Sequence, residues 1–525
     1  MIDAMYSPSR KTRPASPFGS VQNAEMAATI PNAGVLPGEY GAEWFLDDRT
    51  IAGELDLAAG RPPEVVLFGD VVPRDWSRGG GPEKHQFGRV RGRTRSGMDV
   101  VLTDARLDIL LPGRSMGVAH RAVVGIGVAD VPNDAYPRIR FQLTELDLLF
   151  GRGPIESVSW PAEGTPHLHG RYTVEVNPDA DYEWEDAAGL TMSCTYDLQS
   201  SLTQSHAHHV VFAPVVAIST DSPLTVDEWT DQWVMPLLRL SALATRRPQR
   251  LAWLTVNTRP HGQLTDEGQH YASGTVFGSG IEQAPYQAEY RDEWRESENR
   301  PLFTLASLPM PLPDLVRQWR SLESAQNPFV ELYSLALRHT DLPARARYLY
   351  LMQALEALHS FEHREDDEAA REVFVARRAE VFEALERVEL ASGTLRFIKD
   401  SWSKRPADSL DRRLADLMVQ LPDAVRKLLT VPTDNELLAG AVADGVTALE
   451  GQLRKLRNDL SHGRQNYAEA VLRPWVGIAE ALCRAHALRL LNFDDEAIAA
   501  GMAPPTAPGP PPPTEEAEPA DSKDP

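Results

Sequence analysis

The hydrophobic period of the sequence changes near Pro311, and this change constrains the fold more than any other feature. Before it, apolar and polar residues alternate over short runs such as Arg138-Ile139-Arg140-Phe141-Gln142-Leu143, which is typical of half-buried antiparallel strands. After it, apolar residues recur every three or four positions, which indicates helices. We therefore predict an α+β chain, in which a β-rich sandwich or barrel-like domain precedes an all-α helical bundle.

Composition and periodicity also set the expected domain boundaries. Residues 1–37 and 501–525 lack a hydrophobic period and are predicted to be disordered, the second segment being proline-rich and acidic. Between them, the β-rich domain is expected over residues 38–310 and the helical domain over residues 311–500.

The individual elements are predicted from the same patterns. Strands are expected over residues 50–57, 64–68, 88–102, 121–128, 138–149, 172–176 and 210–218. Helices are expected over residues 314–322, 328–338, 344–361, 368–388, 409–417, 437–460 and 467–491. Thr225 and Glu228 form a capping-box pattern that predicts one more helix inside the first domain. Its core-facing stripe would consist of Trp229, Trp233, Leu237, Leu240 and Leu243.

The net charge of −22 limits how such a chain can bind nucleic acid. Phosphate affinity depends mainly on Lys and Arg, so this charge argues against a protein that coats RNA nonspecifically. It favours contact with an anion through a small, locally basic site.

Cysteine usage and hydropathy predict a cytoplasmic protein. Only Cys194 and Cys483 are present, far apart in the sequence, so neither a disulfide framework nor a cysteine zinc cluster is expected. The first residues lack the apolar core of a signal peptide, and no run approaches the ~18 consecutive apolar residues of a membrane span. We therefore expect no contact with a membrane.

The stretch from Leu453 to Arg464 carries the candidate chemistry. Apolar residues spaced by three or four positions predict one buried helical stripe of Val446, Leu449, Leu453, Leu456 and Leu460. Asn458 and His462 are about 40° apart on this helix and lie away from the stripe. Gly463 is typical of a residue that ends a helix. The histidine is therefore expected on the last turn, outside the core.

The same helix is locally basic. Within residues 450–464 four bases outnumber two acids, which leaves a local charge of +2 in a strongly negative chain. An anionic substrate is expected to bind there. The predicted substrate-binding residues are Arg454, Lys455 and Arg464.

Arg457 and His462 suit RNA phosphodiester cleavage, in which the ribose 2′-hydroxyl attacks the adjacent phosphate and the leaving 5′-oxygen is protonated. Histidine titrates near neutral pH and can carry out either proton transfer. Arginine presents a permanently charged planar fork to phosphate oxygens. Asn458, one turn before His462, is expected to orient the imidazole. Glu356, on the otherwise apolar helix 344–361, is a further candidate for the cleft.

The run Arg457-Asn458-Asp459-Leu460-Ser461-His462 matches the Arg-x4-His motif of HEPN domains, including the polar residue that often follows the arginine. The helix containing residues 350–359, the motif helix and a closing helix that ends near Leu491 resemble the Apea-like HEPN family of antiphage defence proteins. One departure is Arg464, which stands where some HEPN toxins have a tyrosine, so the regulation of those toxins is not expected here.

The N-terminal part is also similar to that family. Gly53-Glu54-Leu55, and Gly92 ahead of Val100-Val101-Leu102-Thr103, look like the matching Apea N-terminal domain, so the resemblance covers about residues 38–495. It implies a metal-independent HEPN endoribonuclease without a cofactor, acting in abortive infection on tRNA or other host or phage RNA. It also implies a sensing or regulatory role for the N-terminal domain, with a phage-derived activator as a candidate partner.

The residues themselves favour a homodimer or a higher symmetric oligomer. One chain supplies one His462, whereas the reaction benefits from both a base and an acid. An alternative of a different class stays open, in which the bundle only dimerises or binds a nucleotide or RNA and the β-rich domain senses a ligand.

Other motifs are set aside. The histidines at 206, 208 and 209, with two more at 167 and 169, lack a well-placed carboxylate, so no metal site is predicted. Residues 79–84 lack the spacing of a phosphate loop, and residues 278–280 lack the frame of a nucleophile elbow. Neither NTP hydrolysis nor serine hydrolase chemistry is expected.

Overall fold

The computed structural model describes most of the chain between residues 35 and 503. The described residues are 35–46, 48–69, 71, 83–111, 113–159, 173–204, 207–258, 273–284, 301–339, 341–388, 390, 392–402, 409–429 and 448–503. They form two compact units, which are interleaved along the chain rather than divided by a single cut at residue 310. Of the described residues, those within 35–144, 185–229 and 250–284 form the β unit, and those within 145–184, 230–249 and 301–503 form the helical unit.

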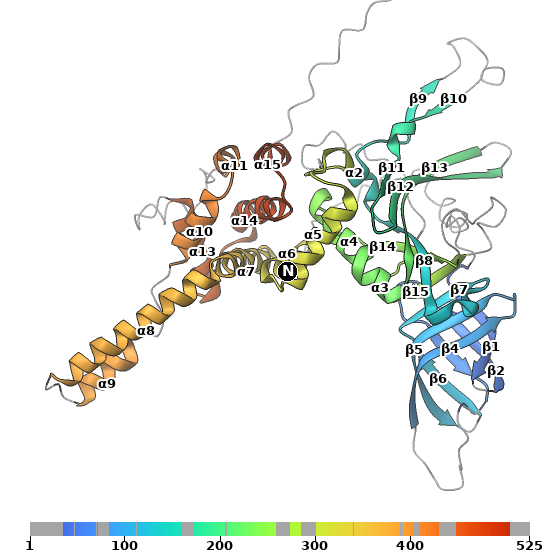
Figure 1. The fold of residues 1–525 in the computed structure, drawn as a ribbon, viewed down its shortest axis with the longest axis horizontal. Helices are drawn as coiled ribbons and strands as arrows, with labels where there is room; N and C mark the ends of the chain where they lie inside the picture. The colour runs from blue at the N-terminus through green and yellow to red at the C-terminus, as the bar shows by residue number, and fades with distance from the viewer. Residues whose placement is uncertain are drawn as a thin grey trace, which may run out of the picture. The chain divides into compact units, whose positions relative to one another are not determined.

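Six strands of the β unit close into a barrel (Figure 1, blue). Antiparallel neighbours follow the order β5-β4-β1-β2-β3-β6, and β6 pairs back with β5. The strands are β1 (Gly38–Leu46), β2 (Arg49–Leu57), β3 (Glu64–Leu67), β4 (Glu83–Thr94), β5 (Asp99–Leu111) and β6 (Arg114–Val118). In β2, the buried residues Ile51, Leu55 and Leu57 alternate with more exposed ones, so one face of the strand fills the barrel interior.

The remaining strands of the β unit continue the sheet from β5 in the order β7-β15-β14-β8-β13-β12. They are β7 (Arg121–Gly125), β8 (Ala135–Leu143), β12 (Leu190–Gln204), β13 (Ala207–Thr225), β14 (Leu251–Asn257) and β15 (Ser273–Gly278). Residues 99–103 of β5 pair with β7, whereas residues 106–111 pair with β6. Asp104, between the two halves, has φ 49°, a backbone conformation that aspartate adopts more readily than most residues. One strand thus belongs to both the barrel and its extension.

Several predicted strands extend further than those in the structure; the strand predicted over residues 121–128, for example, ends at Gly125. Residues 88–102 were expected to form one strand but form parts of β4 and β5, joined by a tight turn. Gly97 has φ 88° in this turn, and the Met98 N–H donates to Thr94 Oγ1 at 3.0 Å. The Ser96-Gly97 pair is the turn signal that the hydrophobic alternation concealed. The strand predicted over residues 138–149 ends at Leu143.

The helical unit contains the helices predicted after Pro311, so the predicted α+β order of a β-rich part followed by a helical part is confirmed. Its longer helices are α4 (Met235–Thr245), α5 (Leu312–Ser324), α6 (Pro328–Arg338), α7 (Ala344–Glu362), α8 (Arg364–Glu386), α9 (Ser392–Ser401), α10 (Leu410–Val419), α13 (Leu449–Ser461) and α14 (Glu469–Leu490). Its short elements are α2 (Leu146–Phe150), α11 (Asp423–Leu428), α15 (Asp495–Met502) and the paired strands β9 (Ile155–Ser159) and β10 (Thr173–Val176). Strand β11 (Tyr182–Glu185) lies at the boundary between the units.

The capping box predicted at residue 225 is confirmed. The Thr225 N–H donates to Glu228 Oε2 at 2.8 Å, and the Glu228 N–H donates to Thr225 Oγ1 at 3.2 Å, ahead of the short helix α3 (Val226–Trp229). The whole predicted stripe is buried: Trp229, Trp233, Leu237, Leu240 and Leu243.

Some predictions fall on residues outside the described ranges. These are the first half of the helix predicted over residues 437–460, Tyr172, and most of the two terminal segments. Among the described residues, no helix is long and apolar enough to cross a membrane.

Trp44 is the centre of the barrel core, and two glycines make room for it. Its side chain is fully buried. A Cβ atom added at Gly92 would lie 2.7 Å from Trp44 Cε3 and 2.8 Å from the Glu43 carbonyl oxygen. A Cβ atom at Gly53 would lie 2.2 Å from the Val66 carbonyl oxygen. All three distances are shorter than packed atoms allow, so positions 53 and 92 require glycine.

We predict that Gly92→Ala destabilises the barrel, because the added methyl group forces Trp44 or the backbone of β1 to shift. The free energy of unfolding should fall by about 1–3 kcal/mol. Denaturant unfolding followed by tryptophan fluorescence measures it. Gly88→Ala on the same strand is the matched control, since a Cβ atom there meets nothing within 4 Å. Equal stabilities of the two variants would contradict the role assigned to Gly92.

Candidate active site

The helix α13 packs through one apolar face. Leu449, Leu453, Leu456 and Leu460 are all buried, which confirms the predicted stripe apart from Val446, which is outside the described residues. Burial of each leucine contributes about 1.5–3 kcal/mol. This packing fixes the rotation of α13 and therefore which side chains leave the core.

The C-terminal end of α13 is a Schellman-type turn. The His462 N–H donates to the Asn458 carbonyl at 3.0 Å, and the Arg464 N–H donates to the Asp459 carbonyl, also at 3.0 Å. Gly463 has φ 63°, the left-handed conformation that glycine adopts without strain. The prediction that Gly463 ends this helix is confirmed.

His462 is the C-cap residue of α13 and is exposed, as predicted. Within the part of the chain that the structure describes, its imidazole has no hydrogen-bond or ion-pair partner. Both ring nitrogens are therefore available to a group that binds from outside.

Arg457 is held by Glu356 of α7, a contact that the sequence alone did not reveal. Arg457 Nε donates to Glu356 Oε1 at 2.9 Å, and Arg457 Nη2 donates to Glu356 Oε2 at 3.2 Å, which makes the pair bidentate. The two side chains are 29% and 25% exposed, so water reaches both. Glu356 thus faces the motif helix, as proposed for a residue of the cleft, and directly contacts the predicted catalytic arginine.

Asn458 contacts the arginine rather than the histidine. Its Oδ1 accepts a hydrogen bond from Arg457 Nη1 at 3.3 Å. Among the described side chains, no hydrogen bond joins Asn458 to the His462 ring, which the sequence had led us to expect. The Arg457 guanidinium has five N–H groups, of which three are used by Glu356 and Asn458. The remaining two have no partner among the described residues and can bind a phosphate oxygen.

Further hydrogen bonds hold α7 against α13. The Tyr348 hydroxyl, fully buried, donates to the Leu453 carbonyl at 2.8 Å. Burial raises the pKa of Tyr348 well above its usual value, so this hydroxyl stays protonated. Arg345 Nη2 donates to the Leu460 carbonyl at 2.6 Å, where a cation favourably meets the C-terminal end of a helix. The position of Glu356 relative to Arg457 is therefore fixed by packing.

The local charge differs from that expected. Arg454 Nε lies 3.6 Å from Asp411 Oδ2 of α10, and Arg457 is paired with Glu356. These two carboxylates, distant in sequence, offset the excess of two positive charges counted along residues 450–464. Of the predicted substrate-binding residues, Lys455 is half-buried and Arg464 is exposed. The basic surface is thus smaller than the sequence indicated, and Arg464 next to His462 is its most accessible cation.

Tyr467 is a residue of this site that the sequence reading missed. Its hydroxyl donates to Asp459 Oδ2 at 2.9 Å and lies 3.0 Å from Gln465 Oε1, so it fastens the loop that follows His462 to α13. Burial and the neighbouring carboxylate raise the pKa of Tyr467, so the hydroxyl remains a donor at neutral pH. Tyr467 lies five residues after His462, and this closeness in the sequence could have identified it as a residue of the site.

The histidine candidates for a metal site cannot be placed. His167, His169 and His206 lie outside the described residues, as do the side chains of His208 and His209. In the described ranges, no group of three or more His, Cys, Asp or Glu side chains is arranged to hold a metal ion.

Comparisons with known proteins give one match. The family model described as ApeA N-terminal domain 1 matches residues 39–319. The searches of curated proteins and of solved structures found no match. The matched region includes the barrel and ends within α5, so it does not extend to Glu356 or to α13. Because it spans more than half of the 525 residues, the chain belongs to the ApeA N-terminal domain 1 family.

Proposed function

We propose that the helical unit is a HEPN-type, metal-independent endoribonuclease and that the whole chain is an antiphage effector of the abortive-infection type. The observation that carries this proposal is the exposed His462 at the end of α13, which has no side-chain partner among the described residues and lies on the same helix as an arginine that Glu356 orients. The family match supports the antiphage role, because it covers the N-terminal part that resembles Apea-type defence proteins.

In the proposed reaction, the ribose 2′-oxygen of the RNA displaces the 5′-oxygen from the adjacent phosphate. A base removes the proton of the ribose 2′-hydroxyl, the 2′-oxygen forms a bond to phosphorus, and the bond from phosphorus to the 5′-oxygen breaks. The leaving 5′-oxygen takes up a proton, which leaves a 2′,3′-cyclic phosphate and a 5′-hydroxyl. His462 carries out one of the proton transfers. The two free N–H groups of Arg457 stabilise the charge that builds on the phosphate oxygens.

Glu356 acts in this proposal as a positioning residue. A long arginine side chain loses conformational entropy when it binds phosphate, and the bidentate contact with Glu356 restricts it in advance. The carboxylate also lowers the local positive charge, which weakens binding of RNA that does not reach His462. Asn458 adds a third contact that keeps the guanidinium plane in place.

A second copy of the chain would supply the missing proton-transfer group. One His462 cannot serve as base and acid in the same concerted step, and among the described residues its ring has no hydrogen-bond or ion-pair partner. A two-fold partner that presents the same end of α13 would bring two histidines to one phosphate. We therefore propose a homodimer with a shared site.

The first prediction from this proposal concerns His462→Ala, which should lose at least about 100-fold in RNA cleavage, because one proton transfer loses its catalyst. The measurement is cleavage of total RNA by purified protein in excess EDTA, where wild type should remain active. His339→Ala is the matched control, since His339 is also an exposed histidine at the C-cap of a helix, α6. Full cleavage by the His462 variant, or no cleavage by wild type in EDTA that magnesium restores, would refute the proposal.

The role of Glu356 is tested with Glu356→Gln, which keeps the size of the side chain but removes the charge that holds Arg457. We expect kcat to fall by about tenfold while KM stays the same or decreases, because the ground state loses a repulsive carboxylate. Glu372→Gln, which changes an exposed glutamate on α8, is the control. An unchanged or higher kcat would mean that Glu356 masks Arg457 instead of positioning it.

Sharing of the site is tested by mixing wild type with an equal amount of His462→Ala protein and allowing subunits to exchange. If one site needs both copies, activity should fall to about one quarter of that of the same total amount of wild type, whereas independent sites retain about half. A mixture with His339→Ala should show no loss. Retention of half the activity, or a monomer at the assay concentration, would contradict the shared site.

A further inference from the structure

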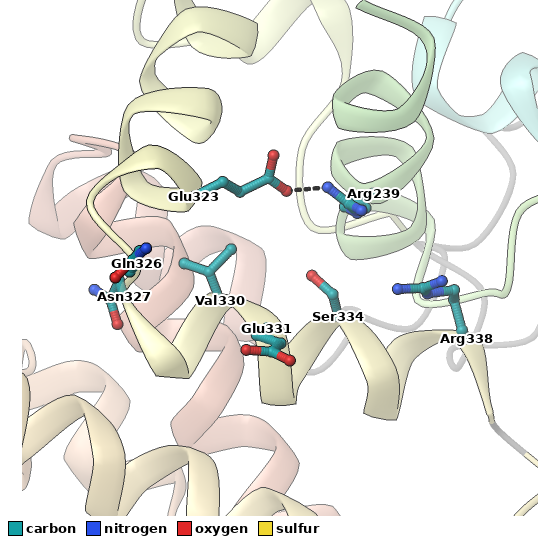
Figure 2. A pocket seen from close by; sticks show the side chains of 8 residues that line it. All are labelled: Arg239, Glu323, Gln326, Asn327, Val330, Glu331, Ser334 and Arg338. Atoms are coloured by element: carbon teal, nitrogen blue, oxygen red, sulfur yellow. Dashed lines mark hydrogen bonds and ion pairs between the residues drawn. The ribbon is translucent and has the colours of Figure 1, made fainter. Parts of the chain in front are cut away.

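A polar cavity lies in the helical unit, and the motif helix α13 does not line it. Its volume is ≈ 520 Å³, within the range of small-molecule sites, and it lies among α4, α5 and α6 (Figure 2). The polar residues that line it and carry the argument are Arg239, Glu323, Asn327, Glu331, Ser334 and Arg338.

Ser334 is the polar group that most needs a ligand. It is 3% exposed, and within the described part of the chain its Oγ has no hydrogen-bond partner. A buried hydroxyl without a partner destabilises the folded state, so such groups are rare unless something binds them. In Figure 2 the hydroxyl points from α6 into the hollow below Glu323 and Arg239.

The two arginines place further donors around the same space. Arg239 pairs through Nη1 with Glu323, which also accepts a hydrogen bond from Trp319 Nε1 at 2.7 Å. Arg239 Nε is buried and has no partner among the described residues. Arg338 is exposed, and its guanidinium likewise makes no hydrogen bond or ion pair with the described residues. A hydroxyl and two guanidinium groups that converge on one space are suited to an oxyanion.

Acceptors also line this cavity. Glu331 has no hydrogen-bond or ion-pair partner in the described ranges, and Glu323 has already neutralised part of the charge of Arg239. A simple anion would use the arginines but leave Glu331 unsatisfied. A ligand that combines a phosphate with hydroxyl groups would contact both the arginines and Glu331.

We propose that this cavity binds a small phosphorylated molecule of nucleotide size, with its phosphate at Ser334, Arg338 and Arg239 and its hydroxyl groups toward Glu331. The site is separate from Glu356, Arg457 and His462, so the proposal does not depend on RNA cleavage. Because α6 packs against α7, which carries Glu356, a ligand here would sit one helix away from the candidate active site.

The test is isothermal titration of the full-length protein with AMP and, separately, with inorganic phosphate. We expect wild type to bind AMP at up to millimolar concentration, with Arg338→Ala and Ser334→Ala each weakening binding, the arginine variant by at least about tenfold. Arg371→Ala, which removes an exposed arginine from α8, is the matched control and should bind as wild type does. Circular dichroism checks that each variant is folded.

Binding of inorganic phosphate as tightly as AMP would support a phosphate site that does not recognise the rest of the ligand. No binding of either probe by wild type would overturn the proposal. Equal affinities of wild type, Arg338→Ala and Ser334→Ala for the probes would also overturn it, because the ligand would then bind elsewhere.

Discussion

The contact between Glu356 and Arg457 joins the two helices that make up the candidate site, and the orientation of the Arg457 guanidinium depends on it. It forms because Tyr348 and Arg345 hold α7 against the carbonyl groups of α13 while the leucine stripe of α13 fixes its rotation. Both partners are partly exposed, so the pair itself contributes only about 1 kcal/mol or less to stability. Its larger effect is on conformation, because it holds a flexible arginine in one place on the same helix as His462.

Carboxylates from other helices offset part of the positive charge of this site. Four bases in residues 450–464 indicate a basic patch when read along the sequence. In three dimensions, Glu356 and Asp411 approach two of them from other helices. An RNA bound there meets few free cations, chiefly Arg464 and the unused N–H groups of Arg457. Such a site discriminates through the arrangement of a few groups rather than through overall attraction.

Features determined by neighbouring residues could be predicted from the sequence. The helix predicted over residues 328–338 matches α6, because Asn327 caps it and Pro328 occupies its first turn. The exposure of His462 followed from the leucine spacing and from Gly463.

Features determined by residues distant in sequence could not be predicted in this way. Glu356 and Arg457 are 101 residues apart, and no local pattern shows that their helices meet. The division of β5 between the barrel and its extension is also a tertiary property, since Asp104 has its positive φ inside a strand that alternates normally. The expected Asn458 contact with His462 was wrong for a similar reason: Glu356 orients the guanidinium so that Arg457 Nη1 donates to Asn458 Oδ1.

We propose that His462 and Arg457 promote attack by the neighbouring 2′-hydroxyl on an RNA phosphate. The most direct measurement is to incubate the purified protein with total RNA in EDTA and to determine the chemical nature of the new ends. Attack by the 2′-hydroxyl should leave a 2′,3′-cyclic phosphate on one fragment and a 5′-hydroxyl on the other. Fragments with a 3′-hydroxyl and a 5′-phosphate, or intact RNA after incubation with folded protein, would contradict this mechanism.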